Sequence, residues 1–353
     1  MVEANERKTP EEIKQRILEA LNDKPLNAQE ISKAISSNWS TVKTYVDDLI
    51  NKEKVKEIYF GEKNIIYQKI TGDTYFDIPI SDEERKKFRT LFYLIIQEYK
   101  KRKKFPTKTH LAKCAVHVIK NEDSGLSKLP IVWYLYGMIP LMISDPSQDY
   151  QEETKFEHEI KIINLINDFI VKKGEKGSGQ IQIEQHKEYG EELYTLSDEF
   201  FKITNLSEWD DKEILEVLNK FFIACPVDKE FPEIFDLTEV VLSIIRKLTI
   251  MNIPLQRYRK EILLTFDSLW KLIALYKFYK SKTIGKDAMN KETLLRFYVG
   301  HAFESRRRNL QETILELNST YLNNLANFDI SKIKLSKEVQ EVRKIMEDWT
   351  GED

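Results

Sequence analysis

The 353-residue sequence is poor in cysteine and glycine, with only two cysteines, Cys114 and Cys225, and 11 glycines. Two cysteines cannot form a disulfide framework, so we expect a reducing compartment. Glycine makes up about 3% of the chain, against a typical ~7%. This scarcity argues against a β-sandwich, a β-propeller or an enzyme with glycine-rich nucleotide-binding loops.

Long hydrophobic runs are also missing. The most apolar stretch, Leu129–Ile143, has 15 residues and contains Pro130 and Pro140. A membrane-spanning helix needs ~20 residues, so this stretch is predicted to form buried core. The first residues lack the apolar segment of a signal peptide. We therefore expect a cytoplasmic protein that has no membrane partner.

Catalytic motifs are absent from the sequence as well. It contains no HExxH zinc motif, no nucleophile elbow, no kinase motif set and no phosphate-binding loop. The five histidines are scattered and suggest no catalytic triad. We therefore predict that the protein is not an enzyme and that it needs no cofactor.

One helical face carries side chains that could bind a metal. His110, Cys114 and His117 are spaced at i, i+4 and i+7 in a helix predicted over Thr107–Lys120. A closed zinc site needs four ligands, and no CxxC or HxxxH motif lies nearby in the sequence. We favour a partly buried polar stripe over a metal site.

Charge is unevenly distributed along the chain. Residues 1–69 contain 12 basic and 12 acidic residues, whereas residues 82–110 contain 10 basic and 4 acidic ones. The whole chain has a net charge of −3, so the remainder is acidic. A neutral start, a basic neck and an acidic body fit local contact with phosphate groups rather than a protein coated by nucleic acid.

The N-terminal region begins with three predicted helices. Thr9, Pro10 and Glu12 form a helix start with a capping box, and Asn27 with Glu30 resembles a second one. A third helix is predicted over Trp39–Lys52, after a short polar turn.

A hairpin is predicted to follow the third helix. Two β-rich runs, Val55–Phe60 and Ile65–Gln68, flank the turn Gly61–Asn64. The order of elements is therefore helix, helix, tight turn, helix and hairpin.

This order, carried by AQEISKAISSNWSTVKTYVDDLINKEKVKEIYFGEKNIIYQK, resembles the winged helix-turn-helix domain of bacterial and archaeal transcription regulators. The resemblance covers residues 9–70, about a fifth of the chain. It implies that the third helix enters the major groove of DNA with its N-terminal end first. The residues that would then face DNA are Trp39, Ser40, Thr41, Lys43 and Thr44. Lys63, at the tip of the wing, would reach a phosphate.

A basic run ends the next predicted helix, which begins at Ser81. The run consists of Lys100, Lys101, Arg102, Lys103 and Lys104. Cations at a helix C-terminus complement the helix dipole, and such runs are usually solvated ends. The alternative is a stripe that contacts DNA phosphates, which would make binding strongly salt-dependent.

The remaining sequence is predicted to be helical. We predict a mainly α protein, with an N-terminal winged helix-turn-helix domain of three helices and a hairpin, and an all-helical body. The predicted parts are the winged-helix domain at 1–72, a helical domain with the basic neck at 73–173, a linker or exposed loop at 174–182, and a C-terminal helical domain at 183–353. Among the predicted helices of the last part are 184–203, 289–325 and 335–349.

The leading hypothesis is a DNA-binding transcriptional regulator. Its winged helix would read the major groove of double-stranded DNA. Its helical body would dimerise, sense a small ligand or recruit a protein partner. A homodimer should prefer two half-sites about one helical turn apart. The alternative is a protein–protein interaction scaffold that uses the winged helix as a docking module.

Overall fold

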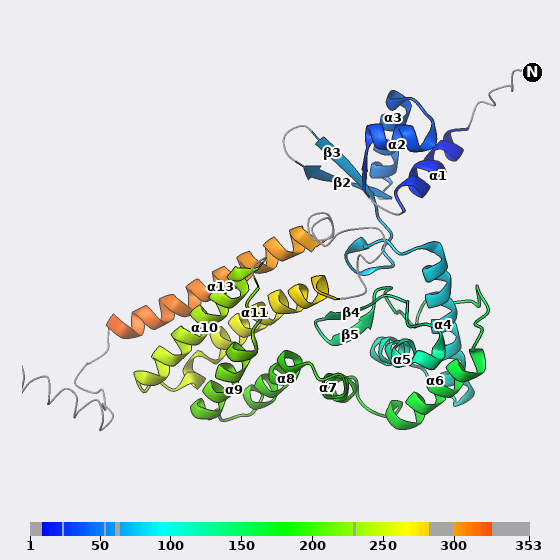
Figure 1. Ribbon diagram of the computed structural model, residues 1–353. Helices are drawn as coiled ribbons and strands as arrows, with labels where there is room; N and C mark the ends of the chain where they lie inside the picture. Colours follow the sequence, from blue (N-terminus) through cyan, green and yellow to red (C-terminus); the bar gives the residue numbers. More distant parts are fainter. Residues whose placement is uncertain are drawn as a thin grey trace, which may run out of the picture. The chain divides into compact units, whose positions relative to one another are not determined.

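The computed structural model describes residues 9–22, 25–52, 54–60, 64–228, 231–281 and 299–326 (Figure 1). The protein is mainly helical, as predicted. It divides into two compact units. The first combines Met1–Gly190 with Ala274–Ser305, and the second combines Glu191–Ile273 with Arg306–Asp353. The predicted domain boundaries at residues 72, 173 and 182 remain predictions.

The N-terminal segment contains the helices and the hairpin expected from the sequence. Its elements are α1 (Pro10–Ala20), β1 (Leu26–Asn27), α2 (Ala28–Ile35), α3 (Trp39–Asn51), β2 (Val55–Phe60) and β3 (Asn64–Lys69). The three strands form an antiparallel sheet in the order β1-β3-β2. The sequence pattern does not predict the short strand β1.

Local capping explains where these helices start. The Thr9 and Asn27 side chains each accept a hydrogen bond from the third helical backbone N–H, and Glu12 and Glu30 complete the two capping boxes. The Asn38 side chain caps α3 in the same way. Each cap satisfies a backbone donor that would otherwise lack a partner.

A small hydrophobic core holds the N-terminal segment together. It is built from one face of each helix and from the strands. Its buried residues are Ile17, Leu21, Leu26, Ile31, Ile35, Val42, Val46, Leu49, Val55 and Tyr67. Burial of these faces leaves the opposite face of α3 toward solvent.

The described residues that follow in the first unit, up to Gly190, form helices α4 to α7 and a second hairpin. The elements are η1 (Tyr75–Asp77), α4 (Asp82–Lys101), α5 (Lys108–Lys120), η2 (Glu122–Ser124), β4 (Ile131–Tyr134), β5 (Gly137–Pro140), α6 (Glu159–Lys173) and α7 (Ser178–Glu188). Helices α4, α5 and α6 pack against one another, and β5 packs against α5.

The hairpin β4–β5 corrects the prediction of an all-helical body. It lies within the apolar run Leu129–Ile143, which is largely buried as predicted. Pro140 cannot donate a helical hydrogen bond, and Gly137 has a φ of +90°, which no helix permits. Short apolar runs do not distinguish strand from helix by periodicity, and here the turn residues decide.

Two further predictions need correction around α7. Helix α7 begins at Ser178, inside the stretch 174–182 for which we expected a linker or an exposed loop. The single helix predicted over 184–203 is interrupted, because Gly190 adopts a φ of +66° between α7 and α8 (Glu192–Thr204). Helix α8 belongs to the second unit.

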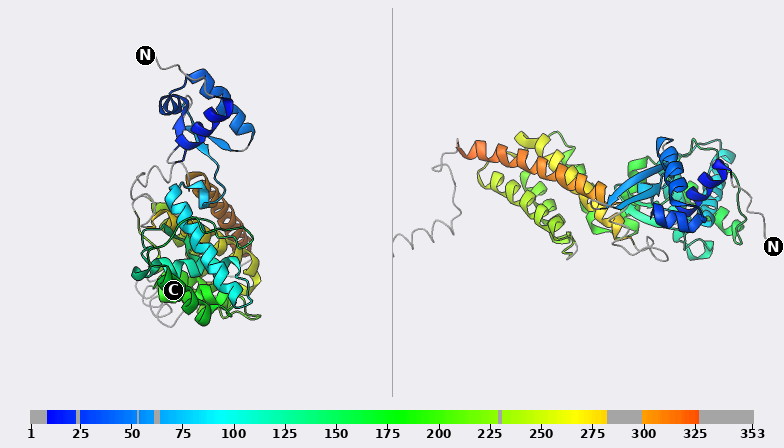
Figure 2. Two further views of the ribbon diagram at one scale, coloured as in Figure 1. Left: turned by 90° about the vertical axis from the view of Figure 1, so that its right-hand side faces the viewer. Right: turned by 90° about the horizontal axis from the view of Figure 1, so that it is seen from above.

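The second unit is helical throughout its described residues. Besides α8 it contains α9 (Asp211–Ala224), α10 (Pro232–Ile250), η3 (Leu255–Tyr258), most of α11 (Arg259–Tyr279) and most of α13 (Gly300–Ala326). Helix α13 runs along α11 and α10 (Figures 1 and 2). The interior of the second unit contains stacked and edge-on aromatic rings, those of Phe200, Phe221, Phe266 and Trp270. The helix predicted over 335–349 lies outside the described residues.

Among the described helices, none combines the length and the apolar character that crossing a membrane requires.

Candidate nucleic-acid interface

The N-terminal end of α3 is largely exposed. The Trp39 side chain is 54% exposed, Ser40 and Thr44 are exposed, and Thr41 is half-buried. Val42 lies on the opposite face and is fully buried. Burial of one face therefore fixes the helix and leaves an indole ring and two hydroxyl groups toward solvent.

The two hydroxyl groups are held by local hydrogen bonds. Ser40 Oγ donates to Asn38 Oδ1 at 2.8 Å, and Thr44 Oγ1 donates to the Ser40 carbonyl at 3.0 Å. Each hydroxyl uses its one proton in these bonds and retains lone pairs that can accept. In this arrangement the two hydroxyl groups offer acceptors rather than donors.

Lys43 points to the hairpin. Its Nζ donates to Tyr67 Oη at 2.9 Å and lies 3.1 Å from Asp47 Oδ1 and 3.9 Å from Glu57 Oε1. It also sits 5.3 Å from the centroid of the Tyr67 ring. The hydrogen bond with Tyr67 is the main cause that raises the pKa of Lys43, and Asp47 adds to it. The ammonium group is thus engaged within the N-terminal segment.

Three other lysines of the N-terminal segment are paired as well. Asp48 lies 2.8 Å from Lys14 Nζ and 2.9 Å from Lys52 Nζ, and Asp77 lies 2.9 Å from Lys56 Nζ. These pairs neutralise much of the positive charge near α3. Lys63, predicted to contact a phosphate, lies outside the described residues.

The basic run ends α4 and forms the turn that follows it. Lys101 pairs with Glu98 at 2.5 Å, and Lys104 pairs with Glu175. Arg102 Nη2 donates to Asn167 Oδ1 at 3.0 Å. Lys100 and Lys103 are exposed and make no ion pair within the described ranges.

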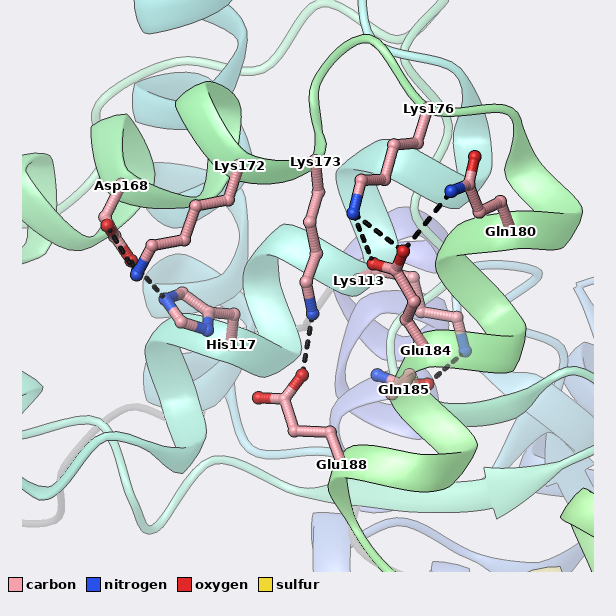
Figure 3. A network of polar contacts seen from close by, with 10 residues as sticks. All are labelled: Lys113, His117, Asp168, Lys172, Lys173, Lys176, Gln180, Glu184, Gln185 and Glu188. Atoms are coloured by element: carbon pink, nitrogen blue, oxygen red, sulfur yellow. Dashed lines mark hydrogen bonds and ion pairs between the residues drawn. The ribbon is translucent and has the colours of Figure 1, made fainter.

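The possible metal ligands of α5 have separate surroundings. His110 Nδ1 is hydrogen-bonded to Thr107 Oγ1 at 2.7 Å, and His117 Nε2 lies 3.8 Å from Asp168 Oδ2 (Figure 3). Burial raises the pKa of the Cys114 thiol and lowers the pKa of both histidines. In the part of the chain that the structure describes, no three His, Cys, Asp or Glu side chains come together to bind a metal.

A buried lysine on α5 is a feature that no sequence pattern predicts. Lys113 is 2% exposed, and its Nζ donates to the carbonyls of Tyr136 and Met138 and to Gln185 Oε1 (Figure 3). These bonds join α5 to the second hairpin and to α7. Its acceptors lie 23 to 72 residues away, so no local pattern could reveal them.

No protein-family model matches the chain, and neither does any curated protein or any solved structure. What the protein binds must therefore be inferred from its own exposed groups. Among the described residues that were predicted to contact DNA, these include the outer face of α3, with Trp39, Ser40 and Thr44, and the cations Lys100 and Lys103, which make no ion pair there.

Proposed function

We propose that this protein is a DNA-binding transcriptional regulator whose N-terminal segment is a winged helix-turn-helix domain. The observation that supports this best is the exposed N-terminal end of α3, fixed by a buried opposite face and followed by the β2–β3 hairpin. The major groove of DNA admits one such helix. The helical remainder would serve dimerisation, ligand sensing or partner recruitment.

Base recognition in this proposal falls to Trp39, Ser40 and Thr44. The hydroxyl groups can accept hydrogen bonds from the amino groups of cytosine or adenine, and the indole ring can contact a thymine methyl group or a sugar. Thr41 lies beside them on the first turn. Lys43 would have to leave Tyr67 and Asp47 in order to reach a base or a phosphate.

A second candidate function is docking to another protein. It is favoured by one observation, the pairing of lysines around α3 with carboxylates. A neutral surface with an exposed tryptophan also suits a protein-docking module, because exposed aromatic residues are enriched in protein interfaces. The two functions differ in whether the intact protein selects a DNA sequence.

The test is selection of duplexes from a random pool by the full chain, followed by polarisation titrations. The Trp39→Ala and Thr44→Val variants should each weaken binding to the selected duplex about tenfold, the loss of one base contact. Gln15→Ala, an exposed change on α1, is the control and should bind as the wild type does. Failure to enrich any sequence would contradict DNA recognition and favour docking to a protein.

A further inference from the structure

The turn after α4 places a lysine where helices usually place glycine. The backbone N–H of Lys104 donates to the Tyr99 carbonyl at 3.0 Å, and that of Lys103 donates to the Lys100 carbonyl at 2.9 Å. Lys103 has a φ of +57°, in the left-handed region. Glycine adopts this conformation without cost at helix ends, whereas a residue with a Cβ is strained there. Strain of this kind is often retained where a side chain has a function.

Three of the five basic side chains hold the turn in place. Glu98, which is buried, pairs with Lys101 and accepts a hydrogen bond from Asn167 Nδ2 at 3.1 Å. Asn167 in turn accepts the hydrogen bond from Arg102. Lys104 pairs with Glu175, which lies just after the end of α6. The turn is therefore tied to α6 and to the residues that follow it.

The two remaining cations and a ring are left toward solvent. Lys100 and Lys103 are both exposed, and Phe105, two residues farther on, is 80% exposed. A pair of cations beside an apolar ring suits the alternating phosphates and sugars of a nucleic acid backbone. An acidic peptide would satisfy the charges but would not need the ring.

We propose that Lys100, Lys103 and Phe105 form a sequence-independent contact with the phosphate backbone of double-stranded DNA. The inference deepens the proposed function and rests on it for the identity of the partner. DNA binding also requires cations that neutralise phosphates, because phosphate neutralisation supplies much of the affinity of DNA-binding proteins. Lys14, Lys43 and Lys52, which lie on α3 or against it, are paired with acids, so the turn after α4 adds cations that are not engaged in this way.

The first experiment measures the salt dependence of binding between the full chain and a labelled duplex of mixed sequence. Each phosphate contact contributes about 0.9 to the slope of log K against log salt concentration. The double variant Lys100→Gln/Lys103→Gln should therefore lose about two units of slope. Lys172→Gln, which removes the same charge from a lysine paired with Asp168, is the matched control and should keep the wild-type slope. An unchanged slope in the double variant overturns the proposal.

The second experiment uses Lys103→Gly, which removes the charge and the backbone strain together. This variant should raise the midpoint of thermal unfolding and at the same time reduce the salt slope by about one unit. Phe105→Ala should weaken binding by a few-fold without a change in slope, because it removes no charge. A raised midpoint with a wild-type slope would make Lys103 an ordinary helix end and would overturn its assigned role.

The ratio of affinities for selected and mixed duplexes separates this inference from the proposed function. The lysine variants should weaken both duplexes equally and leave the ratio unchanged, whereas Trp39→Ala should lower it. If no duplex is preferred but the lysine variants still reduce the slope, the backbone contact holds and sequence recognition by α3 fails. If a duplex is preferred but the lysine variants change nothing, sequence recognition holds and the backbone contact fails.

Discussion

The N-terminal segment and the helices α4–α7 use lysine in different ways. Around α3, lysines such as Lys14 and Lys43 are half-buried and are paired with carboxylates close by. In α5, Lys113 is buried and is held by backbone and amide oxygens from distant parts of the chain. At the end of α4, Lys100 and Lys103 make no ion pair within the described ranges.

This difference shows that the environment of a lysine decides what it contributes. An exposed ion pair contributes little to stability, because water and salt screen it. A buried ammonium group is costly unless an oxygen accepts each of its three protons. Removing the ammonium group then leaves those oxygens without a donor. An exposed, unpaired lysine contributes little to stability and remains available for a ligand. Substitution of one lysine from each environment tests the comparison.

The largest effect is expected for Lys113→Met. The methionine side chain has a similar length but cannot donate to Tyr136, Met138 or Gln185, so the folded state should lose about 3 kcal/mol. Urea unfolding followed by circular dichroism measures the loss. Lys172→Met, at an exposed position, is the control and should change stability by less than about 0.5 kcal/mol. Equal effects of the two substitutions would contradict the comparison.

A smaller effect is expected for the contact between Lys43 and Tyr67. A double-mutant cycle of Lys43→Met and Tyr67→Phe should give a coupling energy of about 1 kcal/mol, because the hydrogen bond is only partly shielded from water. Independent, additive effects of the two substitutions would show that Lys43 is free in solution. Urea unfolding of the two single variants and the double variant provides the three values.

Two histidines of α5, His110 and His117, should make stability fall in acid. Burial lowers the pKa of His110 and His117 below the ordinary value of 6.5 in the folded state, and Asp168 and Glu188 only partly offset this for His117. The unfolded chain therefore binds protons first, so stability should decrease as pH falls through 6.5 toward the lower folded pKa. Urea midpoints measured across this range check the direction, and the variant His110→Asn/His117→Asn should show a flatter curve. A rise in stability over the same range would contradict the prediction.

The smallest effect on folding is expected for Lys100→Gln. The side chain is exposed and makes no ion pair within the described residues, so the free energy of unfolding should change by less than about 0.5 kcal/mol. Thermal unfolding measures it. A larger loss would mean that Lys100 supports the helix end itself, and its effect on DNA binding would then need to be separated from folding.

The sequence predicts the N-terminal segment well because its signals are local. Thr9 with Glu12 and Asn27 with Glu30 lie three residues apart, and the apolar positions repeat at the helical period. The hairpin β4–β5 escapes prediction because its residues are apolar on both faces and give no alternating pattern.

The polar contacts of the candidate site depend on residues that are far apart in the sequence. The winged-helix resemblance includes Trp39 and Thr44 among the residues that would face DNA, and both are exposed. It cannot reveal that Tyr67, 24 residues after Lys43, receives the ammonium group. The same limit applies to the basic run, where Glu175 lies 71 residues after Lys104. Side chains that pair across such distances are positioned by tertiary packing, which single-sequence patterns do not contain.

The His186 and Gln185 side chains approach Gly137 closely, which restricts the residues that related proteins can have at these positions. A Cβ at this position would lie 2.6 Å from His186 Nε2, and its φ of +90° already excludes most other residues. Gln185, beside His186, accepts the hydrogen bond from Lys113. A change at one of these four positions therefore disturbs the contacts of the others, so we expect related proteins to keep a lysine, a glycine and a Gln-His pair at these intervals.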